Sequence, residues 1–444
     1  MLFRTIFATG AAVFALAAGQ PAAAQDAPAP TVTAPPIEFT EWTLANGLRV
    51  IALPDDGTRT MDARQLAAAF ESLGARFFTA PGDEGTLLSV NAPASTAEAA
   101  GRLLVDVLRN AAYPADQVAV QKKRLLDNVR TLRTNPGALT GGLAAPILYG
   151  AAPYGISSNE TTIGRITSDD LIAYRQKWWR PDTMKFAISG GLAPEESVAL
   201  AQRLLGDWKA SGTAPSLPTA RAGEAMAPRT VVIDLPDAGQ ASVLVAVRAP
   251  SRSSADFFPL SIADAVLGGG SSGRLFEEIR TKRSLSYGSY SSQPDRVDEG
   301  YLTASAQTKN ETADDVLGVI LGELDRLSAE PFAPATVDAR RRYLVGGQER
   351  RLESSTGFNY LVAGLLQQGM KVDEAANYAE RLAAVTPEAA QAAAAKYVRA
   401  DRATVIVAGD SKLFLDDLKK IRPDVTVVGA ADVDFADPLG TIGR

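Results

Sequence analysis

One stretch, Asp264–Gln293, reads DAVLGGGSSGRLFEEIRTKRSLSYGSYSSQ and decides how the rest of the chain is interpreted. Its three consecutive glycines predict that a helix ends at about Leu267, because glycine disfavours a helix interior. A second helix is expected to begin near Ser272, which is a good N-cap residue. Beyond Arg283, small residues alternate with tyrosines, which predicts a strand. The unit is therefore helix, glycine loop, helix and strand.

This stretch resembles the second-half signature of the pitrilysin/insulinase family of zinc peptidases, which includes the mitochondrial processing peptidases. In that family a glycine-rich run leads into an Arg and a Tyr seven positions apart, the spacing of Arg280 and Tyr287. The resemblance implies that Arg280 binds peptide carbonyls and that the Tyr287 hydroxyl donates to the oxyanion formed when water attacks the scissile bond. A donor fixed where negative charge develops stabilises the transition state more than the ground state. Simpler interpretations stay open: an Arg that complements a helix dipole and a Tyr that belongs to a strand.

The glycine loop itself has two interpretations. Gly268, Gly269 and Gly270 either end the helix or turn their backbone amides toward substrate, as in a family glycine loop. No Gly-Lys-Ser/Thr follows, so the loop is not a phosphate cradle. Further along, the run Arg340-Arg341-Arg342 is expected to be a solvated helix face, with contact to acidic peptide as the alternative.

Composition excludes several classes of function. The chain has 444 residues, 46% of them hydrophobic, and a formal net charge of −6, which argues against nucleic acid as a partner. It contains no histidine and no cysteine. A Ser-His-Asp triad, a Cys-His pair and an H-x-x-E-H zinc site are therefore excluded by counting. No loop has ligand spacing for Mg²⁺ or Ca²⁺. We expect this chain to bind no metal or cofactor of its own.

The first 24 residues have the pattern of a signal peptide. Arg4 supplies a positive charge, Ile6–Ala18 forms a short apolar core, and Ala22–Ala24 is a small-residue cleavage site. The apolar run is too short to span a bilayer comfortably. We expect a soluble, exported and periplasmic protein without a membrane span after cleavage; a retained anchor is the alternative. Residues 25–37 are rich in Pro and Ala and are expected to be a flexible lead-in.

The first half lacks the segment that would carry catalysis. Asn46-Gly47 predicts a hairpin turn and Leu48–Leu53 a strand. The resemblance implies that a further strand and a helix bearing H-x-x-E-H come next, but the chain runs almost directly into an amphipathic helix, Asp62–Leu73. Both His ligands and the Glu general base are missing together. The third family ligand, a Glu, is matched by Asn128, or by the adjacent Asp127 if the match slips by one residue. One acid without two imidazoles is not a zinc site in either case.

An internal repeat relates the two halves. Thr167–Asp182 aligns with Thr386–Asp401 without a gap, and Met184–Gly190 aligns with Ala403–Gly409 at the same offset. Two copies are too few for a solenoid and indicate two similar α+β domains. We expect two homologous α/β-roll halves, each a mixed or antiparallel sheet with helices on one face, together resembling one half of a peptidase clamshell. The expected boundaries are 38–210 for the first domain, 211–228 for the linker, 229–430 for the second domain and 431–444 for the tail.

These observations predict a zinc-less partner subunit of a heteromeric metallopeptidase of the pitrilysin/insulinase type. A separate chain would supply H-x-x-E-H, zinc and the general base, while this chain would form half of a chamber for unfolded peptide. One alternative is a non-catalytic structural or peptide-binding homologue, like the core subunits of respiratory complexes that share this fold. A lone hydrolase of unrecognised chemistry and a decayed gene are the remaining alternatives.

Overall fold

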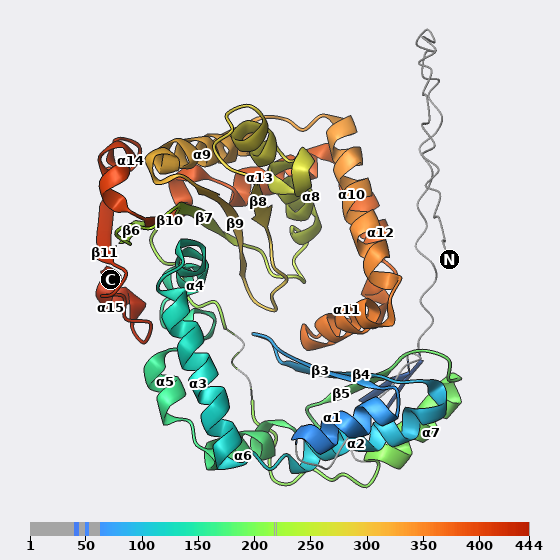
Figure 1. Ribbon diagram of the computed structural model, residues 1–444. Helices are drawn as coiled ribbons and strands as arrows, with labels where there is room; N and C mark the ends of the chain where they lie inside the picture. The colour runs from blue at the N-terminus through green and yellow to red at the C-terminus, as the bar shows by residue number, and fades with distance from the viewer. Residues whose placement is uncertain (1–39, 44–48, 53–62, 217, 219, 444) are drawn as a thin grey trace, which may run out of the picture. The chain divides into compact units, whose positions relative to one another are not determined.

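The computed structural model describes residues 40–43, 49–52, 63–216, 218 and 220–443 (Figure 1). The predicted signal peptide, the lead-in and the Asn46-Gly47 turn lie outside these residues. The first half contains β1 (Thr40–Thr43), β2 (Arg49–Ala52), α1 (Ala63–Ser72), β3 (Arg76–Pro81), β4 (Thr86–Asn91), α2 (Ala97–Asn110), α3 (Ala115–Leu132), α4 (Pro136–Tyr149), α5 (Glu160–Arg165), α6 (Ser168–Trp178), β5 (Lys185–Ile188) and α7 (Pro194–Leu205).

The second half contains a longer series of elements and ends in a short helix. They are β6 (Thr230–Asp234), β7 (Ala241–Ala249), α8 (Phe257–Gly268), η3 (Gly270–Ser272), the π-helix η4 (Phe276–Thr281), β8 (Ser289–Ser292), β9 (Gly300–Thr308), α9 (Ala313–Ala329), α10 (Pro334–Leu352), α11 (Ser355–Gln367), η6 (Val372–Ala375), α12 (Tyr378–Ala383), α13 (Pro387–Tyr397), β10 (Thr404–Gly409), α14 (Leu415–Ile421), β11 (Val425–Gly429) and α15 (Pro438–Ile442).

The second half is built on one six-stranded mixed sheet in the order β11-β6-β10-β7-β9-β8. Strand β10 runs parallel to β6 and antiparallel to β7. Val405 and Val407 of β10 belong to the apolar core that includes α8, α9 and α13, whereas Ile406 and Ala408 belong to a second core on the other face. A strand covered on both faces reads as a continuous apolar run, which explains the sequence TVIVAG. The predicted α+β class with a mixed sheet is confirmed here.

The described strands of the first half form two sheets where the duplication predicts one. One sheet has the order β1-β2-β5 and the other pairs β3 with β4. In the second half, β7 lies between β10 and β9. No described strand takes the equivalent place between β5 and β4. The strand expected before the missing catalytic helix would occupy this place. Its absence therefore leaves the two sheets separate.

Each half contributes one helix that packs on the strands of the other half. Helix α4 is apolar on all sides, as a helix buried on all sides should be. Its residues Leu139, Leu143 and Ile147 are fully buried in the core on the second-half sheet, against Val231, Leu244 and Ile406 among others. Figure 1 shows α4 beside β7 and β10, away from the first-half strands. The second-half sheet is thus covered on one face by its own helices and on the other by α4.

Helix α11 makes the reciprocal contact with strands β4 and β5 of the first half (Figure 1). Ser189 and Asn359 are joined by a hydrogen bond of 2.6 Å, and Asn91 donates to Thr356 at 2.8 Å. Val362 and Leu366 bury their side chains, with Ala187 packed against them. The two halves are consequently one packed unit and not two independent lobes.

The internal repeat is visible as matching elements. Helices α6 and α13 begin 219 residues apart, as do α3 and α10. Each of α6 and α13 is followed by the same short ion pair, Arg180–Asp182 in the first half and Arg399–Asp401 in the second, both at 2.7 Å. The predicted capping of α6 is also present, since Thr167 and Asp170 each accept from the backbone of the other. No helix among the described residues is long and apolar enough to cross a membrane.

Candidate functional site

The glycine loop ends α8 as predicted, and each glycine has a steric reason. A Cβ on Gly268 would lie 2.1 Å from the backbone nitrogen of Ser291 in β8, and one on Gly269 would lie 2.6 Å from the Ala265 carbonyl oxygen. Gly270 has a φ of +72°, which disfavours any other residue. The helix-ending interpretation is therefore confirmed. Whether the loop amides also face substrate stays a prediction.

Arg340 belongs to this loop, and the prediction that the whole arginine run is a solvated face is wrong. Its side chain is buried and donates to the carbonyl oxygen of Gly269 at 3.2 Å, to Ser272 Oγ at 2.8 Å and to the Ser272 carbonyl oxygen. Arg341 donates to the carbonyl oxygens of Leu382 and Val385. Only Arg342 is exposed. A guanidinium satisfies several carbonyls at once, which explains why an arginine holds the loop.

The second helix of the unit forms as a π-helix, η4, with Leu275 and Ile279 fully buried in the second-half core. Insertions of this kind are frequent at functional sites. Tyr287 lies in a bend two residues before β8, so the predicted strand begins later than the alternation indicated. The reason is a local turn: Ser284 has a φ of 53°, and Ser286 Oγ donates to the Gly288 carbonyl at 2.8 Å while accepting from its backbone N–H.

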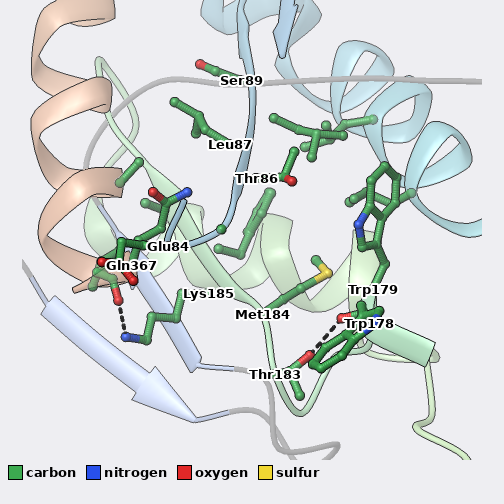
Figure 2. Close-up of a pocket in the computed structure, with 18 of the residues that line it drawn as sticks. Glu84, Thr86, Leu87, Ser89, Trp178, Trp179, Thr183, Met184, Lys185 and Gln367 are labelled. Carbon is green, nitrogen blue, oxygen red and sulfur yellow. Dashed lines mark hydrogen bonds between the residues drawn. The ribbon is translucent and has the colours of Figure 1, made fainter. Parts of the chain in front are cut away.

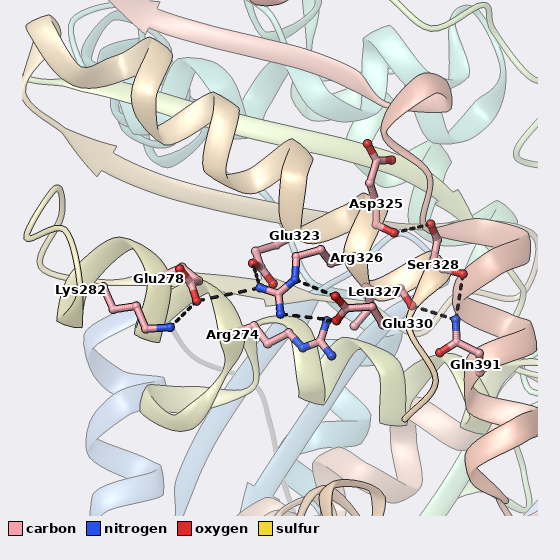
Figure 3. A network of polar contacts seen from close by, with 10 residues as sticks. All are labelled: Arg274, Glu278, Lys282, Glu323, Asp325, Arg326, Leu327, Ser328, Glu330 and Gln391. Carbon is pink, nitrogen blue, oxygen red and sulfur yellow. Dashed lines mark hydrogen bonds and ion pairs between the residues drawn. The ribbon is translucent and has the colours of Figure 1, made fainter. Parts of the chain in front are cut away.

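A polar network holds η4 against α9, and Figure 3 shows its members around Arg326. Glu278 accepts from Lys282 and Arg283, both at 2.6 Å, and lies 4.0 Å from Arg326. Hydrogen bonds from Lys282 and Arg283 lower the pKa of Glu278. Arg326 also contacts Glu323 at 2.6 Å and Glu330 at 3.1 Å. The carboxylates of α9 and η4 thus share cations, which fixes the segment that carries Arg280.

Arg280 and Tyr287 come together at the surface. The guanidinium carbon of Arg280 lies 5.1 Å from the centre of the Tyr287 ring, within cation–π range. Both residues are exposed, and 87% of Tyr287 is accessible to solvent. In the part of the chain that the structure describes, Arg280 has no acidic partner. The pair therefore presents one cation and one phenol hydroxyl to solvent.

A cavity of about 420 Å³ lies where the two first-half sheets separate, and helix α11 of the second half forms part of its wall. It is lined by β4 residues such as Leu87 and by Met184 and Lys185 at β5. Figure 2 shows Trp178 and Trp179 on one side and Gln367 on the other. Thr183 Oγ1 donates to the Trp178 carbonyl oxygen at 3.0 Å and fixes the turn that leads into β5. The cavity is mainly apolar, and its lining also includes the charged residues Glu84 and Lys185.

The residues matched to the third zinc ligand do not form a metal site. Asp127 is half-exposed and bridges Lys123 at 2.7 Å and Arg130 at 3.1 Å, and Asn128 is exposed on α3. Among the described residues, no group of three or more acidic side chains is arranged to hold a metal ion. With no histidine or cysteine in the sequence, the side chains of this chain do not suit zinc.

Comparison with known proteins places the chain near one family. Residues 165–344 match the model described as the peptidase M16 inactive domain. An uncharacterized zinc protease of Mycobacterium leprae is 27% identical over 303 residues, which cover 68% of each chain. The predicted resemblance to the pitrilysin/insulinase peptidases, the M16 family, is confirmed. The matched M16 domain is of the inactive type and spans the glycine loop, Arg280 and Tyr287.

Solved M16-like structures share the fold. A peptidase M16 inactive domain from Pseudomonas fluorescens superposes with a TM-score of 0.74 at 22% identity and covers 84% of this chain and 98% of that chain. The periplasmic protease PqqL of Escherichia coli gives 0.68 at 17% identity, over 83% of this chain and 45% of PqqL. A chain of complex III2 from Candida albicans gives 0.69 at 15% identity, over 88% of this chain and all of that chain.

Sequence reasoning missed one unusual residue close to the glycine loop. Asp264 lies on α8 within the apolar run SIADAVLG, four residues before the loop. Burial raises the pKa of its carboxyl to about 6. A charged residue amid seven apolar or small neighbours was the available signal, because such a residue is seldom buried without a partner.

Proposed function

We propose that this chain is the zinc-less partner subunit of a two-chain M16-type metallopeptidase. The observation that carries the proposal is an asymmetry: the exposed Arg280–Tyr287 pair is kept, whereas the histidines and the catalytic helix are absent. The match to the inactive M16 domain supports it. Zinc and the general base are assigned to a second chain that carries H-x-x-E-H.

In this assembly the two residues have separate roles. The Arg280 guanidinium donates to carbonyl oxygens of a bound peptide and fixes its position. The Tyr287 hydroxyl donates to the oxygen of the attacked carbonyl as negative charge develops there, which favours the transition state. The Glu278 network holds the helix that carries Arg280, and the hydrogen bonds between Ser286 and Gly288 shape the turn that carries Tyr287.

The test is a co-purified pair of this chain and an H-x-x-E-H homologue, assayed on an internally quenched unfolded peptide. Tyr287→Phe is expected to lower kcat by about 100-fold with little change in KM, as loss of one oxyanion donor does. Arg280→Ala is expected mainly to raise KM. Tyr290→Phe is the matched control, since this exposed tyrosine lies three residues away and packs on Phe276. Full activity of the double variant Arg280→Ala/Tyr287→Phe would refute the roles assigned here.

A non-catalytic structural role is the second candidate. The match to a chain of complex III2 from Candida albicans supports it, because that chain belongs to a complex and is covered completely. Affinity purification of the native chain distinguishes the two candidates. Recovery with an H-x-x-E-H peptidase supports the peptidase subunit, and recovery with a membrane assembly supports the structural role.

We further propose that the protein is exported and works in the periplasm. The signal-like first 24 residues motivate this, and the fold neighbour PqqL is itself described as periplasmic. Cell fractionation with amino-terminal sequencing of the mature chain is expected to find it in the periplasmic fraction, starting near Gln25. A cytoplasmic chain with an intact amino terminus would contradict the proposal.

A further inference from the structure

A second cavity, of about 590 Å³, lies within the second half and is separate from the exposed Arg280–Tyr287 pair. Helices α8, α10, α11 and α12 line it, together with η6 and the loop between β8 and β9. Its apolar wall includes Leu344, Leu361 and Leu365. Polar and charged side chains form the rest, so the cavity has two chemically different sides.

Four polar atoms of the lining are buried and have no hydrogen-bond partner among the described residues. They are Oδ1 of Asp264, Nε2 of Gln293, Nε2 of Gln348 and Oε2 of Glu374. Gln348 is only 7% exposed and Glu374 only 8%. Buried polar groups are nearly always paired in proteins, so a cavity lined by several unpaired groups indicates a missing polar occupant.

Three acids and two arginines, Arg252 and Arg351, line the cavity, and one of the acids forms no salt bridge with a described residue. Arg252 packs over Phe257 and Phe258, lies 3.8 Å from Asp295 and 4.0 Å from Glu374, and so serves both acids. Glu374 also pairs with Arg381. By contrast, Asp264 forms no salt bridge with any described residue.

We propose that this cavity binds the α-amino end of an apolar amino acid, either a free amino acid or the first residue of a peptide. A primary ammonium donates to the Asp264 carboxylate and supplies the charge that it lacks. The neighbouring carbonyl or carboxylate oxygen accepts from the side-chain amides of Gln293 and Gln348. The leucine wall receives an apolar side chain. The inference does not depend on the proposed partner role, because every group named lies in this chain.

Calorimetric titration of the full chain tests the proposal with four probes: L-leucine, 4-methylpentanoic acid, the tripeptide Leu-Gly-Gly and its N-acetylated form. We expect the probes with a free ammonium to bind at least about tenfold more tightly than their partners without one, since a charge-assisted hydrogen bond is lost. Tighter binding of L-leucine than of the tripeptide identifies a free amino acid as the ligand, and the reverse identifies a peptide terminus. Equal binding of the acetylated and free tripeptides, or no heat with any probe at millimolar concentration, would overturn the proposal.

Two variants separate the roles of the polar groups. Asp264→Asn keeps the volume and removes the charge, and it should weaken binding of the ammonium probes by at least about tenfold. Gln348→Met should weaken the same probes without changing the preference for a free ammonium. Asp325→Asn, an exposed acid on α9, is the matched control and should bind as the unchanged protein does. Unchanged affinity in both Asp264→Asn and Gln348→Met, with melting curves showing folded protein, would refute the site.

Discussion

Replacing Glu84 by Gln is expected to lower the free energy of unfolding by about 3–5 kcal/mol, the usual cost of removing one partner of a buried ion pair. Glu84 lies in the tip of the β3–β4 hairpin and pairs with Arg221. The side chains are 8% and 14% exposed, respectively, so water cannot solvate the arginine that the substitution leaves unpaired. The expected loss is therefore much larger than for a surface pair.

The same carboxylate joins the two halves of the chain. Glu84 accepts from the backbone N–H of Val297 at 2.8 Å and from the hydroxyl of Tyr154. Next to it, Asp83 pairs with Arg296, whose guanidinium lies over the Tyr154 ring at 4.9 Å. The burial of the cluster raises the pKa of Tyr154 to about 12, so the phenol stays a donor at any physiological pH. A loosened hairpin tip should consequently loosen the contact between the halves.

Urea denaturation of a double-mutant cycle isolates the pair. Arg221→Met removes the buried charge, so Glu84→Gln/Arg221→Met should be less destabilised than the sum of the two single variants. Glu71→Gln is the control, an exposed acid on α1, and should change the free energy of unfolding by less than about 0.5 kcal/mol. Additive effects of the two substitutions would show that Glu84 and Arg221 do not depend on each other.

The sequence predicted most of the local structure around the glycine-rich stretch because local chemistry determines it. Three glycines must end a helix, and the capping pair Thr167 and Asp170 starts α6 where its spacing indicated. The duplication was readable for the same reason, since helix and strand patterns recur at one offset. The contact between Arg280 and Tyr287 is a finding of the structure, and their functional roles remain proposals.

Contacts between distant segments were not readable from the sequence. Helices α4 and α11 each pack on strands of the other half. Sequence periodicity identifies the apolar face of a helix, but it does not identify the sheet that this face contacts. Arg340 looked solvated because its partners, the carbonyls of a loop about 70 residues earlier, carry no sequence signal. The family resemblance marked a strand as absent from the first half, but it did not show that the remaining strands would form two separate sheets.

Asp264→Asn is expected to stabilise the unliganded protein at pH 7, by about 3 kcal/mol. Burial raises the pKa of Asp264 from 3.8 to about 6 in the folded chain. The folded state therefore favours the neutral acid. The stability that the neutral Asp264 side chain contributes is fully present below pH 4 and is lost as the pH rises through about 6. At neutral pH the folded protein carries a buried charge without a countercharge, and the amide removes that cost.

The pH dependence identifies the cause. Free energies of unfolding measured in urea between pH 4 and pH 7.5 should show the advantage of Asp264→Asn shrinking toward the acid end. Arg252, Asp295, Arg351 and Glu374 also line the cavity, and they remain in both proteins, so their titration largely cancels in the difference. Asp325→Asn, exposed on α9, should give no such pH-dependent gain. A difference between Asp264→Asn and the unchanged protein that is constant with pH, or a loss of stability at pH 7, would mean that the Asp264 carboxylate already has a countercharge in the folded chain. A binding site for an ammonium group needs an unpaired carboxylate, which lowers the stability of the unliganded protein. The bound ligand then supplies the missing positive charge.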